Sequence, residues 1–319
     1  MMFKEIAEET GSAYAENMSG ECFYYGRGVA QDLTKAVKCF TKAAEKGNSA
    51  GMERLGLCFE FGRGVEKNLT TAVEWYTKAV EKGNSAAMSQ LGFCLQHGKG
   101  VEKDLMKAVE LYTKSAEMGD SDGMNNLGTY YFEHSACVDE RGLAKAVEWF
   151  AKSAENGSSY AMNNLGCCFE HGTGVEQNWT KAIEWYTMSA EKGNCAAAMN
   201  NLGVIFSRGN GVEKDLNKAI EWYTKSAEMG NTGAMNNLGF FFHHADGADQ
   251  NWTKAVEWYT KAAEKGNSAA MYNLGFGFHH GIGVEQDLAK AVEWYTKARD
   301  MGTKGMQGQI DEINARLAN

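Results

Sequence analysis

The sequence contains no proline, so every turn in its 319 residues must be built from glycine, asparagine and aspartate. Basic residues are also few: 32 Lys and Arg stand against 41 Asp and Glu, which gives a net charge of −9. The chain shows no basic stripe of the kind that binds nucleic acid, and no apolar run approaches the ~20 residues of a membrane-spanning helix. The N-terminal segment is acidic and lacks the apolar core of a signal peptide. These absences exclude nucleic-acid and membrane partners from our expectation and predict a cytoplasmic protein, provided that no leader has been removed.

The chain instead contains one unit repeated eight times. The unit consists of a Leu-Gly pair, then Gly-x-Gly-Val and then Lys-Ala-x-x-Trp-Tyr, and several copies differ from this pattern in one or more of its parts. A period of 36 to 38 residues separates the repeat glycines, which are Gly20, Gly56, Gly92, Gly128, Gly166, Gly203, Gly239 and Gly275. Such a period is typical of a solenoid, in which each unit contacts only its neighbours. The sequence therefore predicts an all-α solenoid, and it predicts that function lies on a surface.

One repeat shows how its first helix, here called helix A, is specified. Within residues 86–97 the apolar residues Met88, Leu91 and Leu95 recur at the spacing of one helical face. The repeat glycine lies on this face and has no side chain, so it allows a second helix to approach closely. Gly98 is expected to end the helix as a left-handed C-cap.

The second helix, helix B, is predicted over residues 105–117. Asp104 is its expected N-cap, and Asp or Asn holds this position in most repeats. The aromatic pair of helix B is expected to be mostly core, so losing one such Trp should cost about 3–5 kcal/mol. A Trp that stacks on a ligand is the alternative. The pairs are Trp75-Tyr76, Trp149-Phe150, Trp185-Tyr186, Trp222-Tyr223, Trp258-Tyr259 and Trp294-Tyr295.

The repeats divide the chain into three predicted parts. Residues 1–12 form an N-terminal half repeat, residues 13–303 the eight repeats, and residues 304–319 a C-terminal capping helix. The capping helix has one apolar stripe: Met306, Ile310, Ile313 and Leu317. Two loops depart from Gly-x-Gly-Val, at residues 134–142 and 245–248. We expect a local change of curvature near residue 135.

Cysteines recur once per repeat rather than in pairs within a repeat. Cys22, Cys58, Cys94 and Cys168 lie two residues after a repeat glycine. A disulfide framework needs two partners at close range in each unit. We therefore interpret these residues as small, semi-apolar groups that face a neighbouring helix.

The repeat resembles the Sel1-like repeat family, a relative of the tetratricopeptide repeats. The shared pattern is Ala-x-x-x-Leu-Gly, Gly-x-Gly-Val, Asp-x-x-Lys-Ala and Trp-Tyr-x-Lys-Ala-Ala-Glu-x-Gly. It is nearly complete in residues 50–85, 86–121, 160–195 and 269–302. The resemblance implies a right-handed superhelix of antiparallel helix pairs, and an adaptor that holds other proteins together.

Some secreted bacterial members of this family carry a disulfide within each repeat. This chain has Ala43, Ala79 and Ala190 where that branch would place one of the two cysteines. The expectation of a cytoplasmic protein therefore stands.

Helical phase predicts which surface a partner would use. With the repeat glycine at 0° and a step of about 100° per residue, positions −2 and +5 of helix A lie opposite the core. The candidate partner-binding residues at position −2 are Arg54, Gln90, Asn126, Asn164, Asn201, Asn237 and Asn273. At position +5 they are His97, His171, Arg208, His244 and His280. An Asn side chain both donates and accepts hydrogen bonds, so we expect helix A to line a concave face that binds an extended partner segment. The alternative is that Asn at −2 is solvated or bonded to the adjacent helix.

All histidines lie at the ends of A helices, where an imidazole complements the C-terminal end of the helix dipole. A pH-sensitive partner contact and a metal site are the alternatives, although no cysteine or carboxylate spacing supports a metal. The expected protein is a scaffold that binds another protein or peptide, with no enzyme activity, metal or cofactor. Self-assembly is the second hypothesis and a small-ligand or hydrolytic protein the third. The motif Ser189-x-x-Lys192 resembles a nucleophile motif, but we interpret it as a variant of the repeat itself.

Overall fold

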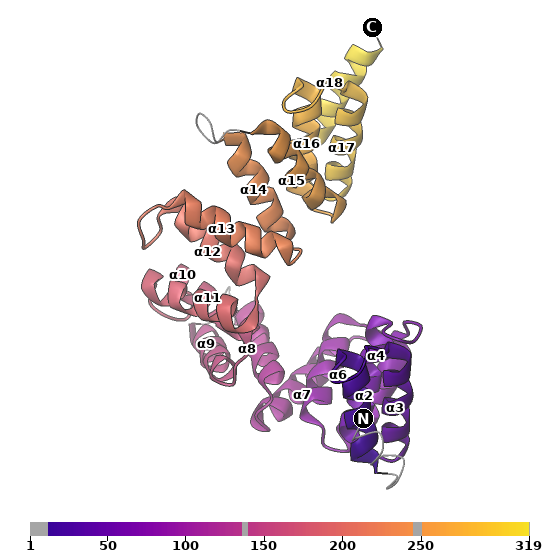
Figure 1. Ribbon diagram of the computed structural model, residues 1–319. Helices are drawn as coiled ribbons and strands as arrows, with labels where there is room; N and C mark the ends of the chain where they lie inside the picture. The colour runs from indigo at the N-terminus through magenta and orange to yellow at the C-terminus, as the bar shows by residue number, and fades with distance from the viewer. Residues whose placement is uncertain (1–11, 136–139, 245–250, 319) are drawn as a thin grey trace. The chain divides into compact units, whose positions relative to one another are not determined.

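The computed structural model describes residues 12–135, 140–244 and 251–318, which form helices and turns with no strand among them (Figure 1). The expected half repeat at residues 1–12 lies almost wholly outside this part. Residues 136–139 of the first altered loop and all of the second also lie outside the described part. The change of curvature near residue 135 therefore stays a prediction. The A helices are α2 Ala13–Tyr25, α4 Ser49–Phe61, α6 Ser85–His97, α8 Ser121–Ser135, α10 Ser159–His171, α12 Ala196–Arg208, α14 Thr232–His244 and α16 Ser268–His280. The B helices are α3 Leu33–Glu45, α5 Leu69–Glu81, α7 Leu105–Glu117, α9 Glu140–Glu155, α11 Trp179–Gly193, α13 Leu216–Glu228, α15 Trp252–Glu264 and α17 Leu288–Asp300.

Local chemistry sets the helix ends where the sequence predicts them. Gly98 ends α6 with φ 68°, and its N–H donates to the carbonyl of Cys94. Asp104 caps α7, because its Oδ1 accepts a hydrogen bond from the backbone N–H of Lys107 at 2.9 Å. These contacts satisfy backbone groups that the helix itself leaves unpaired, and they recur in most repeats. The all-α prediction of paired helices is confirmed.

The A and B helices of a repeat meet at the repeat glycine. A Cβ placed on Gly56 would lie 2.5 Å from Cε1 of Tyr76, so only glycine allows the tyrosine ring to pack there. The ring of Tyr76 is fully buried, whereas Trp75 is only half-buried. The prediction that the pair is mostly core is confirmed for the tyrosine, whereas the tryptophan packs against the core cluster and is only partly buried. One residue turns the helix by about 100°, which moves the indole to the edge of the core.

The exposed side of the indole is covered by a lysine three residues later. The Nζ atom of Lys78 lies 4.2 Å from the ring centroid of Trp75, and four other B helices repeat this contact. In α7, Leu111 replaces the tryptophan, and Lys114 forms an ion pair with Glu110 at 2.6 Å. Cation–π contacts of this kind contribute about 0.5–1 kcal/mol at exposed sites.

Neighbouring repeats meet at the second glycine of Gly-x-Gly. Gly64 has φ +74°, and a Cβ there would overlap the backbone carbonyl of Leu33 at the start of α3. Gly100 meets Leu69 and Gly174 meets Leu143 in the same way. The loop that joins α4 to α5 thus lies directly on the backbone of the preceding repeat.

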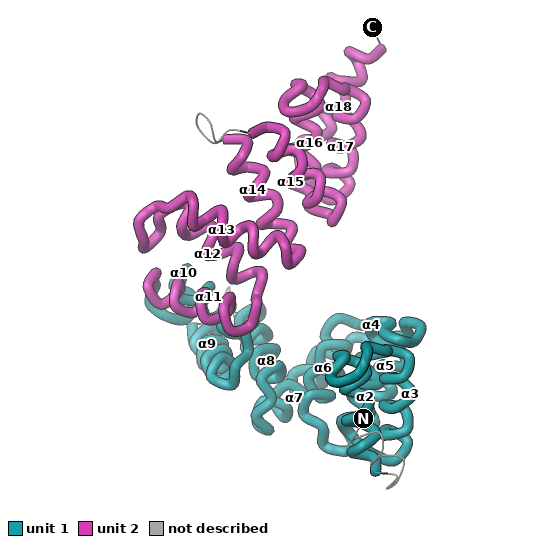
Figure 2. The backbone as a smooth tube through the Cα atoms, in the orientation of Figure 1, with its two compact units in different colours: residues 1–177 teal, residues 178–319 magenta. Residues whose placement is uncertain are grey.

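The chain divides into two compact units, residues 1–177 and 178–319 (Figure 2). Unit 1 contains α2 to α10 and unit 2 contains α11 to α18, and each has its own apolar core. Unit 2 ends in α18 Met306–Leu317, which packs on α17 and buries Met306, Ile310 and Ile313. Leu317, the last residue of the predicted apolar stripe, is 51% exposed, so the buried part of the stripe ends at Ile313.

The described cysteines are free thiols, as the spacing predicts. Burial raises the pKa of Cys58 to about 11 and the pKa values of Cys94 and Cys168 to about 12. Since the thiolate is the reactive form, these side chains act as core groups rather than nucleophiles. In the part of the chain that the structure describes, no helix has the length and apolar character to cross a membrane.

Candidate functional site

Position +5 of each helix A lies at the exposed end of the helix, as helical phase predicts. All five candidate residues at this position are exposed: His97, His171, Arg208, His244 and His280. Three of the histidines pack on a phenylalanine one turn earlier. The ring centroids are 4.4 Å apart for Phe93 and His97, 3.9 Å for Phe240 and His244, and 4.4 Å for Phe276 and His280.

The imidazoles divide into two groups with different surroundings. The Nδ1 atom of His244 lies 3.0 Å from the carbonyl oxygen of Phe240 at the helix end, which favours the structural reading of the histidines. His243 points inward instead, and its Nδ1 atom lies 3.4 Å from the hydroxyl of Tyr259. Burial lowers the pKa of His243 to about 4, so this imidazole is neutral at physiological pH.

Position −2 is less exposed than helical phase predicts. All seven candidates there are half-buried: Arg54, Gln90, Asn126, Asn164, Asn201, Asn237 and Asn273. The reason is that successive A helices lie side by side. A side chain that faces away from helix B therefore contacts a neighbouring helix A. A single-helix projection contains no information about this second neighbour.

Three of the asparagines form hydrogen bonds between successive A helices. The Nδ2 atom of Asn164 donates to Oδ1 of Asn125 at 3.0 Å. In unit 2 Asn237 donates to Asn200 at 3.0 Å, and Asn273 donates to Asn236 at 3.1 Å. Each bond joins position −2 of one repeat to position −3 of the repeat before it. The alternative reading, in which Asn bonds to the adjacent helix, holds for these three residues.

The acceptor residues at position −3 were not among the sequence candidates. Their signal in the sequence is the doublet Asn-Asn at −3 and −2, which occurs in four repeats: 125–126, 163–164, 200–201 and 236–237. A carboxamide has more hydrogen-bonding capacity than one partner uses. The inter-helix bonds therefore fix the orientation of these side chains while leaving polar atoms for a ligand.

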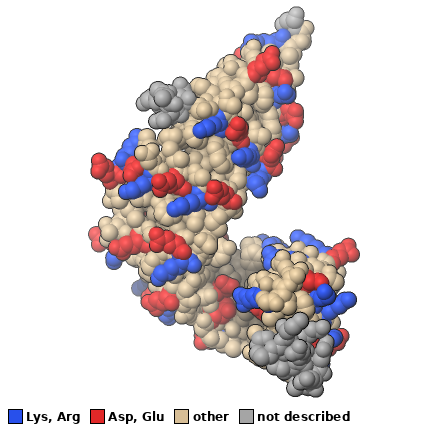
Figure 3. All heavy atoms as spheres, in the orientation of Figure 1, with Lys and Arg blue, Asp and Glu red and all other residues tan. Residues whose placement is uncertain are grey.

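The A helices of the two units carry different charges. In unit 2, the helices α12, α14 and α16 contain Arg208 as their one Lys, Arg, Asp or Glu residue. The visible charges of unit 2 alternate in sign along its surface (Figure 3). The A helices of unit 1 contain seven carboxylates and one arginine: Glu16, Glu21, Glu53, Glu60, Asp122, Glu133, Glu170 and Arg54.

One acidic residue of unit 1 is buried in an unusual way. Glu53 is 7% exposed, and its side chain lies 3.6 Å from Nε of Arg54, which is nearer to Glu21 at 2.6 Å. Burial raises the pKa of Glu53 to about 7; Arg54 opposes the shift, and Glu21, Asp120 and Asp122 add to it. Glu53 was not among the sequence candidates, because its burial depends on the packing of successive A helices.

Glu60 shows the contrasting case of a buried carboxylate with a fixed structural role. It is 5% exposed, and its Oε2 atom accepts a hydrogen bond from the hydroxyl of Tyr76 at 2.6 Å. Gln96 has the same position in the next repeat and accepts from Tyr112 at 2.8 Å. This bond ties helix A to the buried tyrosine of helix B.

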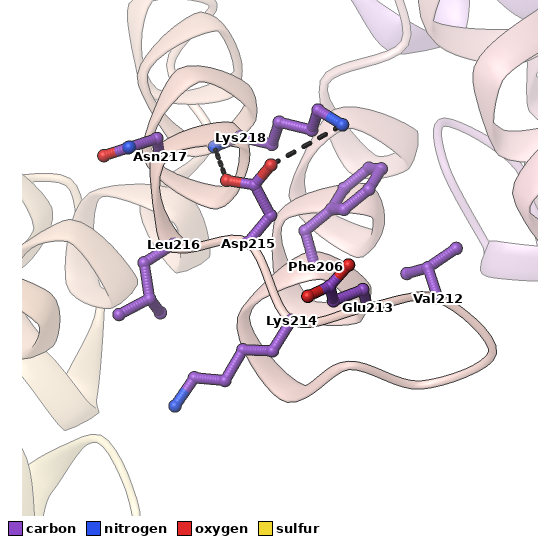
Figure 4. A pocket seen from close by; sticks show the side chains of 8 residues that line it. All are labelled: Phe206, Val212, Glu213, Lys214, Asp215, Leu216, Asn217 and Lys218. Atoms are coloured by element: carbon purple, nitrogen blue, oxygen red, sulfur yellow. Dashed lines mark hydrogen bonds and ion pairs between the residues drawn. The ribbon is translucent and has the colours of Figure 1, made fainter.

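A surface pocket of about 660 Å³ lies at the turn between α12 and α13 (Figure 4). Its carboxylate Asp215 accepts a hydrogen bond from the N–H of Lys218 at 3.0 Å and pairs with Nζ of the same residue at 3.5 Å. These contacts lower the pKa of Asp215, and Figure 4 shows Lys214 pointing away from it. The pocket is thus built by a helix cap, and α16 and α17 form an equivalent one with Asp287.

The Ser189-x-x-Lys192 motif is also explained by the repeat. Ser189 is fully buried, whereas Lys192 is exposed. The equivalent serines Ser115 and Ser226 donate hydrogen bonds to the first residues of their own A helices, at 2.8 and 2.6 Å. A serine in this position has a structural role.

Comparison with known proteins agrees with this architecture. The Sel1 repeat model matches eight segments: residues 13–48, 49–84, 85–120, 121–158, 159–194, 196–231, 232–267 and 268–303. No curated protein matches the chain. A solved structure of a protective antigen of uropathogenic Escherichia coli is 32% identical, with a TM-score of 0.55, and the match covers 98% of this chain and 73% of that one.

Two further solved structures are similar. A Sel1 repeat protein from Oxalobacter formigenes is 26% identical with a TM-score of 0.66, and the match covers 98% of this chain and 90% of that one. An immunity protein from Pseudomonas aeruginosa is 23% identical with a TM-score of 0.50, covering 68% and 81%, and it shows the fold alone. Sel1 repeat proteins are generally non-catalytic scaffolds that bind other proteins. With eight matched repeats and a 32% identical relative, the chain belongs to the Sel1 repeat family.

Proposed function

We propose that this protein is a cytoplasmic, non-catalytic scaffold that binds a segment of a partner protein on the exposed side of its A helices. The observation that carries the proposal is the row of oriented carboxamides at positions −3 and −2. Neighbouring A helices hold these groups in place, as in Asn237 and Asn200. A backbone that crosses the helices could pair with them, because a carboxamide has two N–H donors and an oxygen that can accept two hydrogen bonds.

The exposed residues beside this row add apolar contact area. Phe240 is 54% exposed, and His244 stacks on it at the end of α14. Aromatic side chains supply much of the binding energy at protein interfaces. The A helices of unit 2 are therefore suited to an extended segment that combines backbone hydrogen bonds with apolar side chains.

A pull-down from a lysate of the source organism tests the proposal. The quadruple variant Asn164→Ala, Asn201→Ala, Asn237→Ala, Asn273→Ala is expected to lose a partner that the wild type retains. The matched control carries four exposed, uncharged substitutions on B helices: Thr70→Ala, Thr180→Ala, Asn217→Ala and Thr253→Ala. Helicity and melting temperature are measured for every variant, because each lost hydrogen bond costs about 0.5–1.5 kcal/mol.

A second variant separates binding from stability. Phe240→Ala with His244→Ala removes two exposed side chains and leaves the Asn–Asn bonds in place. We expect this variant to melt like the wild type and to bind the partner more weakly. Partners retained by both A-helix variants would place the binding surface elsewhere and contradict the proposal.

A second function, self-assembly, was kept open by the sequence. Self-assembly is favoured by the exposed aromatic side chains of α2, where Tyr14 is 62% exposed and Tyr25 is 46% exposed. Light scattering of the purified chain distinguishes the two functions, since a scaffold for other proteins gives a concentration-independent mass.

A further inference from the structure

The first A helices of unit 1 carry a surface that we call the acidic A surface, composed of Glu21, Glu53, Asp120 and Asp122. Glu21 lies on α2, Glu53 on α4, and the two aspartates at the start of α8. Ser89 of α6 lies beneath this set: it is 1% exposed, and its Oγ donates a hydrogen bond to Oδ1 of Asp120 at 2.6 Å. Three A helices of unit 1, α2, α4 and α8, thus contribute to the surface.

The negative charge of this surface is only partly neutralised. Arg54 contacts both Glu21 and Glu53, but its shorter contact is with Glu21. Among the described residues no group donates a hydrogen bond to the carboxylate of Glu53, although its side chain is nine-tenths buried. With all carboxylates ionised the surface has four negative charges against one positive charge. A buried carboxylate without hydrogen bonds is costly unless a cation compensates it.

A second, independent feature is the unpartnered side chain of Asn17. It is 7% exposed, and its Oδ1 atom has no hydrogen-bond partner among the described residues. Asn17 holds position −3 of α2, where Asn125 and Asn236 each accept a bond from position −2 of the next repeat. In the next repeat that position is Arg54, which contacts Glu21 instead. Asn17 precedes Glu21 by one turn of α2, and the residue that would hold the place of its donor, Arg54, is paired with Glu21.

Aromatic rings flank the same stripe of α2. Tyr14, Met18, Glu21 and Tyr25 recur at the spacing of one helical face, and both tyrosines are exposed. Guanidinium groups already pack on such rings here, since Arg27 lies 4.7 Å from the ring centroid of Tyr25. Carboxylates, an amide oxygen and aromatic faces are together the groups that recognise arginine and lysine side chains.

We propose that the acidic A surface of unit 1 binds an arginine or lysine side chain of the partner segment, with Glu53 as the central acceptor. This inference rests on the proposed function, because it names the chemistry of the partner. It also assigns different roles to the two units. Unit 1 selects a basic residue, whereas the A helices of unit 2, with Arg208 as their one charged residue, carry the carboxamides and aromatic side chains described above.

The surface predicts how binding depends on pH. The carboxylate form of Glu53 attracts a cation, and burial together with Glu21, Asp120 and Asp122 holds its pKa at about 7, against the opposing effect of Arg54. Raising the pH from 6 to 8 ionises Glu53 and is expected to tighten binding. Burial and Asp120 also raise the pKa of Asp122.

Fluorescence anisotropy with the full chain tests this inference at 150 mM salt. The probe is a labelled nonapeptide of alternating serine and arginine, and its neutral counterpart has citrulline in place of arginine. The variant Glu53→Gln removes the central charge. The control Glu74→Gln makes the same charge change on the exposed face of α5.

We expect the arginine peptide to bind the wild type at least about tenfold more tightly than the citrulline peptide, which corresponds to about 1.4 kcal/mol. Glu53→Gln should lose most of this difference and its pH dependence, whereas Glu74→Gln should stay within twofold of the wild type. The melting temperature at pH 8 checks folding, and it should be unchanged or higher for Glu53→Gln, since a buried uncompensated charge is removed.

Two results would overturn the inference. One is equal affinity for the arginine and citrulline peptides, and the other is equal weakening by Glu53→Gln and Glu74→Gln. If the asparagine variants still lose a partner in the pull-down, only the chemistry assigned to unit 1 fails. If the peptides behave as expected but the asparagine variants retain every partner, the acidic A surface stands and the carboxamide row fails.

Discussion

Gly64→Ala is expected to lower the free energy of unfolding by about 2–5 kcal/mol, although it adds a single methyl group. Two costs combine. A non-glycine residue at φ +74° costs about 1–2 kcal/mol, and forcing an atom into a packed contact costs about 1–3 kcal/mol. The Cβ would overlap the carbonyl of Leu33 and lie 2.9 Å from the backbone nitrogen of Thr34. Backbone atoms cannot rotate away as a side-chain end can.

Gly28→Ala is the matched control for this experiment. Gly28 holds the same place in its loop with φ +72°, but a Cβ at this residue would have no described atom within 4 Å. The substitution should therefore show the conformational cost alone, about 1–2 kcal/mol. Urea unfolding followed by circular dichroism gives both values. Equal destabilisation by the two substitutions would contradict the view that the second glycine of the loop sets the contact between repeats.

Tyr76→Ala is expected to cost about 3–5 kcal/mol, the usual range for deleting a buried aromatic ring. The ring is fully buried against Gly56, and its hydroxyl is the hydrogen-bond donor to the buried carboxylate of Glu60. Trp75→Ala should cost less, about 1–2 kcal/mol, because the indole is half-buried and loses less apolar contact. Thermal and urea unfolding of the two variants give the comparison.

Tyr76→Phe separates the ring from the hydroxyl. It keeps the packing and leaves Glu60 without its donor, so it should cost about 1–3 kcal/mol. A Trp75→Ala variant less stable than Tyr76→Ala would contradict the assignment of the tyrosine to the core. Such a result would show that the partly buried indole contributes more to stability than the fully buried tyrosine ring.

Most of the fold could be predicted from the sequence because it depends on local chemistry. The spacing of Met88, Leu91 and Leu95 defines a helical face within one helix, and all three are buried. Gly98 and Asp104 set helix ends through contacts that span only a few residues. The period of the repeat then extends each of these assignments along the chain.

The errors arose where a residue meets more than one neighbour. Position −2 was placed correctly on helix A, but a neighbouring helix A half-buries it, and Asn237 has its partner, Asn200, on the preceding one. The burial of Glu53 has the same origin. A projection of one helix shows which face lies opposite helix B, but it does not show which residues contact the A helices of neighbouring repeats.

The partial exposure of the tryptophan has a different cause. Hydrophobicity predicts that an indole is buried, but Lys78 lies over the ring of Trp75 and covers its outer face. Large amphipathic side chains at the edge of a core can be shielded by the stem of a charged residue. The repeated Trp-x-x-Lys spacing in the B helices is the signal that could have indicated this arrangement.

Site-specific photo-crosslinking tests the central claim most directly, namely that the exposed side of the A helices is the partner-binding face. The photoreactive residue p-benzoylphenylalanine replaces the exposed His244 at the end of α14, and in a control it replaces the exposed Glu221 on α13. After irradiation in a lysate of the source organism, we expect an adduct with another protein from position 244 and none from position 221. An adduct from position 221 alone would contradict the claim, and an adduct with a second copy of the chain would favour self-assembly in its place.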